Sequence, residues 1–159
     1  MLLSNSLDVA VAEGFMKSDQ VVSRIIMQDE MVLICPASHR FAGRASVPAG
    51  ELAEESFLIR EEGSGTREVF ESVMSAHGVE YRVGGVLNNA EAIKLAVMEG
   101  MGISVISKLS VQREIGRGEL HALRIRGMHF ARNFSLFHHR NKYITPVLAE
   151  FMRMCEKPL

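Results

Sequence analysis

Short apolar runs alternate with longer segments in which apolar residues return every three or four positions. The run Phe57–Ile59 indicates a buried strand, and from Thr66 the apolar side chains fall on one face of a helix that ends before Gly78. The same alternation of strand and helix continues along the rest of the chain. It predicts an α/β fold with a largely parallel sheet.

The predicted elements follow one another in a regular order. Strands are expected at Leu7–Ala12, Val21–Met27, Met31–Cys35, Phe57–Ile59, Tyr81–Leu87, Met101–Ile106, Leu120–Ile125 and Asn133–His139. Helices are expected at 66–77, 90–99, 107–116 and from Pro146 onward. Because the first of these strands is largely apolar and alternates poorly, we expect it to be buried on both faces.

Two helix N-termini carry capping signals. Asn88 and Asn89 follow the strand that ends at Leu87 and are predicted to cap the next helix, and Asn88 has the spacing of a capping box with Glu91. Thr145 is the predicted cap of the last helix, whose first position is Pro146, where the missing N–H costs no hydrogen bond. The inner face of this last helix is predicted to consist of Val147, Leu148, Phe151, Met152 and Cys155.

Composition narrows the class of protein. The 159 residues suffice for one domain or two small lobes with a real core, and 47% of them are apolar, as in soluble globular chains. The net charge of −1 comes from 18 basic and 19 acidic residues, which are scattered and form no basic stripe. We therefore do not expect this chain to bind nucleic acid by itself.

Neither a membrane segment nor a disulfide is expected. No stretch reaches the roughly 18 consecutive apolar residues of a spanning helix, and the N-terminus lacks the basic region of a signal peptide. Cys35 and Cys155 are far apart in the sequence. We interpret both as buried or incidental thiols of a reducing compartment.

The loop Arg60–Thr66 is the first candidate for chemistry, but it lacks the catalytic patterns. Glu62 occupies the position that the first glycine of a nucleophile elbow around Ser64 would need. Glu68 stands where a dinucleotide-binding loop has its third glycine, and no P-loop lysine follows. Two interpretations stay open: Ser64 or Thr66 caps the helix, or the N-terminus of the helix binds an anion.

Metal ligands and acid–base pairs are not indicated either. The adjacent His138 and His139 point to opposite faces of a strand, and no histidine or cysteine has the spacing of a zinc site. The neighbouring pairs Glu54–Glu55 and Glu61–Glu62 are typical of solvated turns. We expect no metal, no cofactor and no catalytic residue.

Two helix N-termini follow directly after predicted strands, at Gly63–Thr66 and at Leu87–Asn89. In open α/β sheets, ligands bind outside the carboxyl ends of strands, and the first-turn N–H groups of a helix favour anions. Two such ends in one cleft would suit a small carboxylate or phosphate. Since no catalytic group accompanies them, binding without turnover is predicted.

An ordered set of short motifs covers nearly the whole chain. The motifs are Leu7–Val11, Asp29–Leu33 with Pro36 and His39, Phe57–Glu61 with Gly63–Arg67, Asn89–Lys94, Gly100–Ser107, Glu114–Leu120, Arg132 and the last helix around Phe151. Each motif alone is weak, whereas their common order is fairly specific. On these motifs the chain resembles the effector-binding domain of a LysR-type transcriptional regulator.

The resemblance implies a two-lobe fold like that of type 2 periplasmic binding proteins, with an effector in the cleft between the lobes. Lobe one would comprise residues 1–36 and 130–159, and lobe two residues 37–129. A cytoplasmic protein that senses a small, anionic metabolite and thereby modulates transcription is implied. The effector-binding residues implied, all in lobe two, are Ser64, Gly65, Thr66, Leu87, Asn88 and Asn89.

Relative to the family pattern, the chain is expected to be truncated at its N-terminus. The winged helix-turn-helix, the linker helix, and the first strand and helix of lobe one have no counterpart in it. DNA would therefore be contacted only through a helix-turn-helix domain that is absent from this chain. We also expect lobe one to be incomplete, with a bare sheet edge that favours self-association into a homo-oligomer.

Two other functions share this architecture. A solute-binding protein of a transporter would carry a signal peptide or a cysteine anchor, and neither is visible in the sequence. An enzyme on the same two-lobe fold would need an acid–base constellation, which lobe two lacks. The sensor domain of a transcriptional regulator is therefore preferred, and the two alternatives stay open.

Overall fold

Contacts between residues divide the chain into two units. Unit 1 comprises Met1–Asp29 and Arg132–Leu159, and unit 2 comprises Glu30–Ala131. The structure, a computed structural model, describes residues 1–4, 6–14, 16 and 18–156. Two lobes with boundaries at 36/37 and 129/130 stay a prediction from the sequence.

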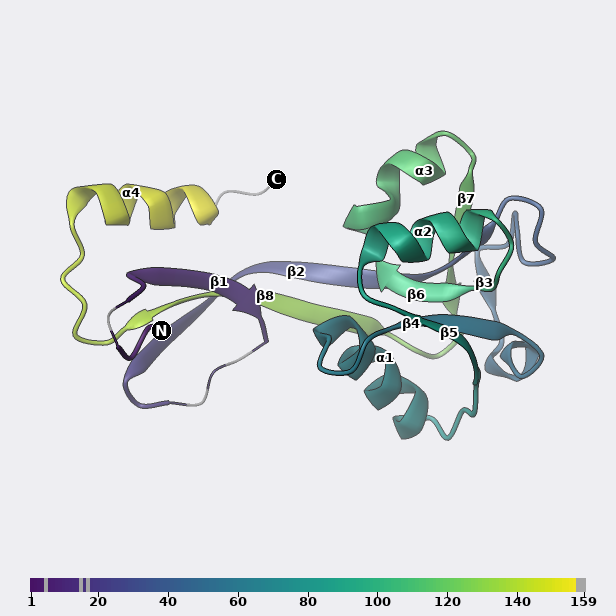
Figure 1. Ribbon diagram of the computed structural model, residues 1–159, viewed down its shortest axis with the longest axis horizontal. Coiled ribbons are helices and arrows are strands. Elements are labelled where there is room, and N and C mark those ends of the chain that lie inside the picture. The colour runs from purple at the N-terminus through teal and green to yellow at the C-terminus, as the bar shows by residue number, and fades with distance from the viewer. Residues whose placement is uncertain (5, 15, 17, 157–159) are drawn as a thin grey trace. The chain divides into compact units, whose positions relative to one another are not determined.

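Unit 2 is built from strands and helices that mostly alternate. Strand β2 (Val21–Pro36) enters it from unit 1, and β8 (Phe130–His139) leads back. Between them lie β3 (Ser46–Val47), the 3-10 helix η1 (Ala49–Leu52), β4 (Ser56–Arg60), α1 (Gly65–Ala76), β5 (Arg82–Leu87), α2 (Ala90–Met98), β6 (Ser104–Ser107), η2 (Leu109–Val111), α3 (Gln112–Gly116) and β7 (Leu120–Ile125). Figure 1 shows α1 on one side of the strands of unit 2, and α2 with α3 on the other.

Unit 1 has fewer elements of its own. Strand β1 (Val9–Glu13) pairs antiparallel with β8. Helix α4 (Pro146–Cys155) begins after Thr145, whose hydroxyl accepts a hydrogen bond from the Leu148 N–H at 3.2 Å. The cap predicted for this helix is therefore confirmed. A small core contains Leu2, Val21 and Phe137, with Ala10 packed against it.

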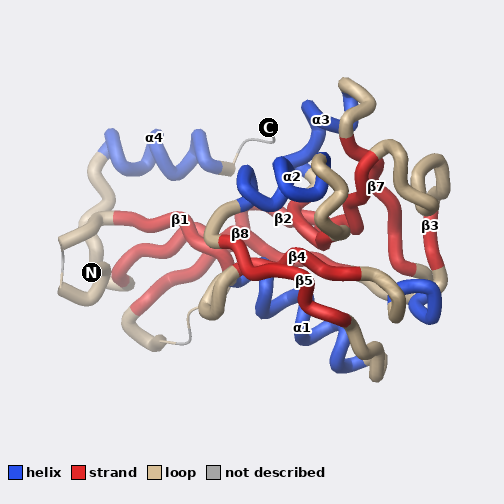
Figure 2. The backbone as a smooth tube through the Cα atoms, turned by 45° about the vertical axis from the view of Figure 1, so that its right-hand side comes forward, coloured by secondary structure: helices blue, strands red, loops and turns tan. Residues whose placement is uncertain are grey.

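The predicted largely parallel sheet is wrong for the six-stranded sheet, whose order is β1-β8-β2-β7-β3, with β6 beside β2. Strand β2 runs antiparallel to β6 and β7, β1 runs antiparallel to β8, and β3 and β7 pair in parallel. Strands β4 and β5 form a separate parallel pair, seen in Figure 2. The physical reason lies in the connections. Helices connect successive strands from β4 to β7 and allow those strands to run in the same direction, whereas β2 and β8 are the strands that connect the two units.

The segment 21–36 was predicted as two strands because polar residues interrupt it, but it folds as one strand of 16 residues. Its central carboxylates have cationic partners. Asp29 is 1% exposed, and the Arg132 Nε donates to it at 2.8 Å. Glu30 lies 2.8 Å from a guanidinium nitrogen of Arg124 and 3.2 Å from the Lys108 Nζ. Because these charges are paired, the strand continues through them.

Two faces that were predicted to be buried are exposed. In β1, Val9 and Ala10 are half-buried, and the three residues that follow are exposed. None of the ten residues of α4 is buried, and Val147 is 82% exposed. The spacing of apolar residues in 146–155 therefore predicted the helix correctly. The prediction that its apolar face is buried was wrong, because no other segment of the described chain covers that face.

Strand β4 lies between two hydrophobic cores. Phe57 and Ile59 pack on the face that α1 covers, and Leu58 packs on the face that α2 covers. The helix residues in these clusters are Phe70, Met74, Ile93 and Val97. Because successive strand residues point to opposite faces, a strand buried on both sides is apolar throughout, as predicted for 57–59.

Gly102 lies where two backbone segments approach closely, as a glycine inside an apolar strand run indicates. A Cβ on this residue would lie 2.4 Å from the backbone oxygen of Ser56, a distance that no side chain can occupy. The next residue, Ile103, exchanges backbone hydrogen bonds with β4, donating to Ser56 at 2.9 Å and accepting from Leu58 at 2.8 Å. Gly102 thus lets the chain before β6 lie directly against β4.

Neither cysteine forms a disulfide. Cys35 is fully buried in the larger core of unit 2, where burial and, second, the charge of Glu55 raise the pKa of its thiol to about 11. Cys155 is partly exposed on α4. The two thiols therefore differ strongly in accessibility.

Candidate functional site

The parallel pair β4–β5 brings two helix N-termini to the same end of unit 2. Its register ends with Arg60 opposite Leu87, and the Glu61 N–H donates to the Leu87 carbonyl at 3.1 Å. Helix α1 starts five residues after the end of β4, and α2 starts three residues after the end of β5. The segments 63–66 and 87–89, which sequence reasoning placed at one cleft, thus start from paired strand ends.

Ser64 occupies the N-cap position of α1, in extended conformation. Its backbone carbonyl accepts the Glu68 N–H at 3.0 Å, but its hydroxyl makes no capping hydrogen bond to the described first turn. Gly63 supplies the left-handed backbone (φ +80°) that the tight turn before it requires. Gly65 then opens the helix, and Thr66 is buried in its first turn with 7% exposure. The Ser64 hydroxyl is therefore not committed to the cap.

At α2 the prediction that Asn88 and Asn89 cap the helix is confirmed for Asn89, whereas the capping box predicted for Asn88 is wrong. Asn89, not Asn88, is the N-cap, and its side-chain oxygen accepts the Ala92 N–H at 2.7 Å. The Asn89 amide nitrogen donates to the Asn88 side-chain oxygen at 2.9 Å. Glu91 does not close a capping box but pairs with Lys94 at 2.8 Å. The physical reason is that the helix begins at residue 90, so only Asn89 can reach the third N–H.

Asn89→Ala is expected to lower the free energy of unfolding by about 1 kcal/mol, because it removes the side-chain cap of α2. The matched substitution Asn88→Ala removes an exposed amide that caps nothing, and it should cost less than about 0.5 kcal/mol. Urea denaturation followed by circular dichroism measures both. Equal costs for the two variants would contradict the assignment of the cap to Asn89.

The side-chain charges around α1 are largely balanced within the loop. The Arg60 guanidinium donates two hydrogen bonds to the Glu61 carboxylate, at 2.7 and 2.8 Å. This contact and, second, a backbone hydrogen bond of Glu61 lower the pKa of its carboxyl to about 2. Arg67 pairs with Glu71, one helical turn away, at 2.7 Å. Helix N–H groups, rather than unpaired cations, are therefore the main positive feature of this end.

A buried lysine that was not predicted from the sequence connects helix α2 to the segment 110–114. Lys94 is 5% exposed, and its Nζ donates to Glu114 Oε1 at 2.8 Å and to the Ser110 carbonyl at 3.1 Å. Burial opposes the charge of Lys94, but the hydrogen bonds to Glu114 and Glu91 outweigh it and raise the pKa of the ammonium group. The sequence signal for an ion pair of Lys94 was its spacing from Glu91, because its other partner, Glu114, lies 20 residues away.

Within 1–4, 6–14, 16 and 18–156, no three or more His, Cys, Asp and Glu side chains are grouped as a metal ion would require. In the same part of the chain, every helix is too short or too polar to cross a membrane.

Known proteins resemble the chain over most of its length. The model of the LysR substrate binding domain matches residues 1–158. The RuBisCO operon transcriptional regulator of Allochromatium vinosum is 34% identical over 151 residues, which are 95% of this chain and 50% of that protein. CbbR of Rhodospirillum rubrum is 32% identical over 147 residues, 92% of this chain and 48% of that regulator. The chain thus spans about half the length of the curated relatives it matches.

Solved structures confirm the predicted fold class, a mixed α/β fold of the type 2 periplasmic-binding-protein kind. The regulatory domain of CcmR from Synechocystis PCC6803, in complex with 2-PG, superposes with a TM-score of 0.86 at 28% identity, covering 98% of this chain and 74% of that one. The effector binding domain of QuiR, in complex with shikimate, gives 0.81 at 20% identity, with coverages of 97% and 72%. With the family model and these regulators in agreement, the chain belongs to the LysR substrate binding domain family.

Proposed function

We propose that this chain is the effector-sensing domain of a transcriptional regulator and that it binds a small, anionic metabolite without converting it. The observation that carries the proposal is the pairing of β4 with β5, from which the N-termini of α1 and α2 start side by side. The first N–H groups of a helix have no partner within it, and the helix dipole adds partial positive charge there. Two such ends together favour a carboxylate or a phosphate.

The residues assigned to this site have distinct roles. The Ser64 hydroxyl is not used by the cap of α1, so it can donate to or accept from a ligand. Asn89 is committed to the cap of α2, and its amide nitrogen orients the exposed side chain of Asn88. Contacts with the ligand are therefore assigned to Ser64 and Asn88, and to the backbone beside them. The proposed set is Ser64, Gly65, Thr66, Leu87, Asn88 and Asn89.

The relatives support a small-molecule ligand and a role in transcription. CcmR, at 28% identity, is described in complex with 2-PG, and the curated relatives are named as transcriptional regulators. By this proposal the chain is not an enzyme, works in the cytoplasm, and contacts DNA only through another segment of a longer, self-associating regulator. Effector binding would shift the population of the conformations in which that regulator acts on DNA.

Asn88→Tyr is expected to weaken effector binding at least about tenfold, because a bulky ring replaces an exposed amide at the rim of the site. The cap of α2 stays intact, since it belongs to Asn89. At the buried Thr66, a bulky residue would disturb the packing. Thr66→Val keeps the shape of the side chain and tests only whether its hydroxyl contributes to effector binding. Ser75→Tyr, exposed near the other end of α1, is the matched control.

The measurement is a thermal-shift screen of small carboxylates and phosphates, with 2-PG and inorganic phosphate included, followed by calorimetry on the compounds that stabilise the chain. The proposal predicts that the control binds like the unmodified chain, and that both site variants keep their circular dichroism spectrum. If Asn88→Tyr bound the effector with unchanged affinity, the site would lie elsewhere.

A further inference from the structure

A second polar pocket lies in unit 2, at the opposite end of β4 and β5 from the proposed effector site. Its volume is about 490 Å³, and its walls include Ser38, Arg40, Glu54, Arg82 and the segment 100–102. Arg82 is the first residue of β5, and β4 starts two residues after Glu54. The pocket thus uses the amino ends of the same two strands whose carboxyl ends precede α1 and α2.

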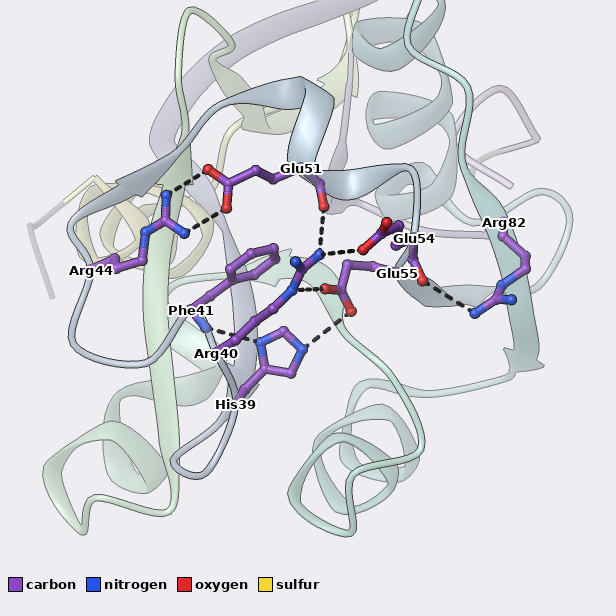
Figure 3. Close-up of polar contacts among 8 residues, drawn as sticks. All are labelled: His39, Arg40, Phe41, Arg44, Glu51, Glu54, Glu55 and Arg82. Carbon is purple, nitrogen blue, oxygen red and sulfur yellow. Dashed lines mark hydrogen bonds and ion pairs between the residues drawn. The ribbon is translucent and has the colours of Figure 1, made fainter.

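One wall of this pocket is a satisfied network of charges, drawn in Figure 3. The Glu55 carboxylate accepts from the Arg40 Nε at 2.8 Å and lies 3.2 Å from the His39 Nε2. The His39 Nδ1 accepts the Phe41 N–H at 3.2 Å, which leaves Nε2 to donate to Glu55. Arg40 also donates to the Glu51 carbonyl at 3.0 Å. These groups form a fixed wall and are not available to a ligand without breaking it.

Two charged groups of opposite sign at the same pocket, on Arg82 and Glu54, make no hydrogen bond to another side chain of the described residues. The Arg82 guanidinium donates only to the neutral main-chain carbonyl of Glu54, at 3.3 Å, and no carboxylate of the described residues lies within ion-pair distance of it. The Glu54 carboxylate is 83% exposed and forms one ion pair, with the Arg40 guanidinium at 3.6 Å, which is too long for a hydrogen bond. Figure 3 shows the two residues as neighbours. The pocket therefore offers one guanidinium without a carboxylate partner and one exposed carboxylate whose only ion pair, among the described residues, is long.

We propose that this pocket binds a free α-amino acid, with its carboxylate on Arg82 and its ammonium group on Glu54. The two arginines and two glutamates of the pocket, residues 40, 82, 54 and 55, cancel in charge, so a simple anion gains no net attraction and faces Glu54. An α-amino acid zwitterion carries both charges on groups bound to the same carbon atom and satisfies both side chains by charge-assisted hydrogen bonds. The Ser38 hydroxyl and the open space at Gly100 suit a small side chain.

The test uses the 159-residue chain labelled with ¹⁵N, and follows the Arg82 Nε–H resonance by NMR at constant ionic strength. L-Alanine is titrated against N-acetyl-L-alanine, which lacks the ammonium charge, and L-alanine methyl ester, which lacks the carboxylate. The expected result is a saturable shift with L-alanine, and affinities at least about tenfold weaker for both derivatives. Binding of N-acetyl-L-alanine as tight as that of L-alanine, or no saturable shift at all, would overturn the proposal.

Variants separate the two charges. Arg82→Gln and Glu54→Gln should each weaken L-alanine at least about tenfold, with shifts read on the backbone amides of 100–102. Both residues are exposed, and Glu54→Gln provides the answer if Arg82→Gln fails to fold. Arg113→Gln, at an exposed arginine of α3, is the control and should bind normally. Unchanged affinity of Glu54→Gln for L-alanine would contradict the proposal that the pocket binds the ammonium group of a zwitterion. Neither variant touches the site at α1 and α2, so the outcome is independent of the proposed effector.

Discussion

Arg132→Met is expected to lower the free energy of unfolding by about 3–5 kcal/mol, because it leaves the buried Asp29 carboxylate without its cation. Asp29 is 1% exposed, and the Arg132 side chain is 11% exposed. The guanidinium is 2.8 Å from Asp29, 2.6 Å from Glu13, and 5.1 Å from the ring centre of Phe134. It thus joins β1, β2 and β8 of unit 1, and its loss affects all three.

Two comparisons make this prediction specific. Arg153→Met removes a guanidinium from an exposed pair with Glu150 on α4, and should cost less than about 1 kcal/mol. Replacing both buried partners, as Asp29→Leu with Arg132→Met, should recover most of the lost stability, since the carboxylate that then loses its guanidinium, Glu13, is 36% exposed and not buried. Urea denaturation of the three variants measures the differences. A cost for Arg132→Met no larger than that for Arg153→Met would show that the buried pair contributes little.

Phe57→Ala is expected to destabilise unit 2 by about 3–5 kcal/mol, through lost burial and the cavity that remains. Phe57 is fully buried, and its ring centre lies 5.2 Å from that of Phe70 and 5.8 Å from that of Tyr81. Since Phe70 belongs to α1, the cavity would open beneath the helix that carries the proposed site. Weaker effector binding should therefore accompany the loss of stability.

The matched control is Phe151→Ala, because Phe151 is the same residue type but 46% exposed on α4. Its cost should stay below about 1 kcal/mol. Native-state hydrogen exchange assigns each loss to a unit, with the amides of β4 and β6 reporting on unit 2. Fast exchange of these amides in Phe57→Ala and normal exchange in Phe151→Ala is the expected pattern. Equal exchange in both would contradict the importance of the Phe57 core.

The parts of the fold that could be predicted from the sequence are determined by residues that are close together in it. The strand 56–60 and the helix after it follow from a short apolar run, a glycine-rich turn and a helical spacing. Thr145 with Pro146 marks the start of α4 by local chemistry alone. Gly102 could be interpreted because close backbone approach requires a residue without a Cβ.

The parts that were missed depend on partners far away in the sequence. Asp29 suggested a break in β2, and only its contact with Arg132, 103 residues later, explains why the strand continues. The direction of each strand likewise depends on which segments connect the two units. The periodicity of apolar residues does not show this. The apolar face of α4 was interpreted as buried because spacing shows that a face exists, not what lies against it.

The candidate sites differ in the same way. The segments 63–66 and 87–89 could be proposed because strand, turn and helix follow one another in the sequence, although the capping box predicted at Asn88 does not form. The pocket at Arg82 was missed because its walls come from separate segments. The pair Glu54–Glu55 was interpreted as a solvated turn, which is correct for Glu54 at 83% exposure, but wrong for Glu55 at 14%.

The contrast between the two thiols makes the chain suitable for single-site labelling. Cys35 has no exposed surface, and with a pKa of about 11 almost none of it is thiolate at neutral pH. A maleimide dye should therefore react at Cys155 alone in the folded chain. Since the sequence contains no tryptophan, such a dye would supply the fluorescence signal that tryptophan provides in other proteins. Reaction of a second equivalent would then report the opening of the core around Cys35.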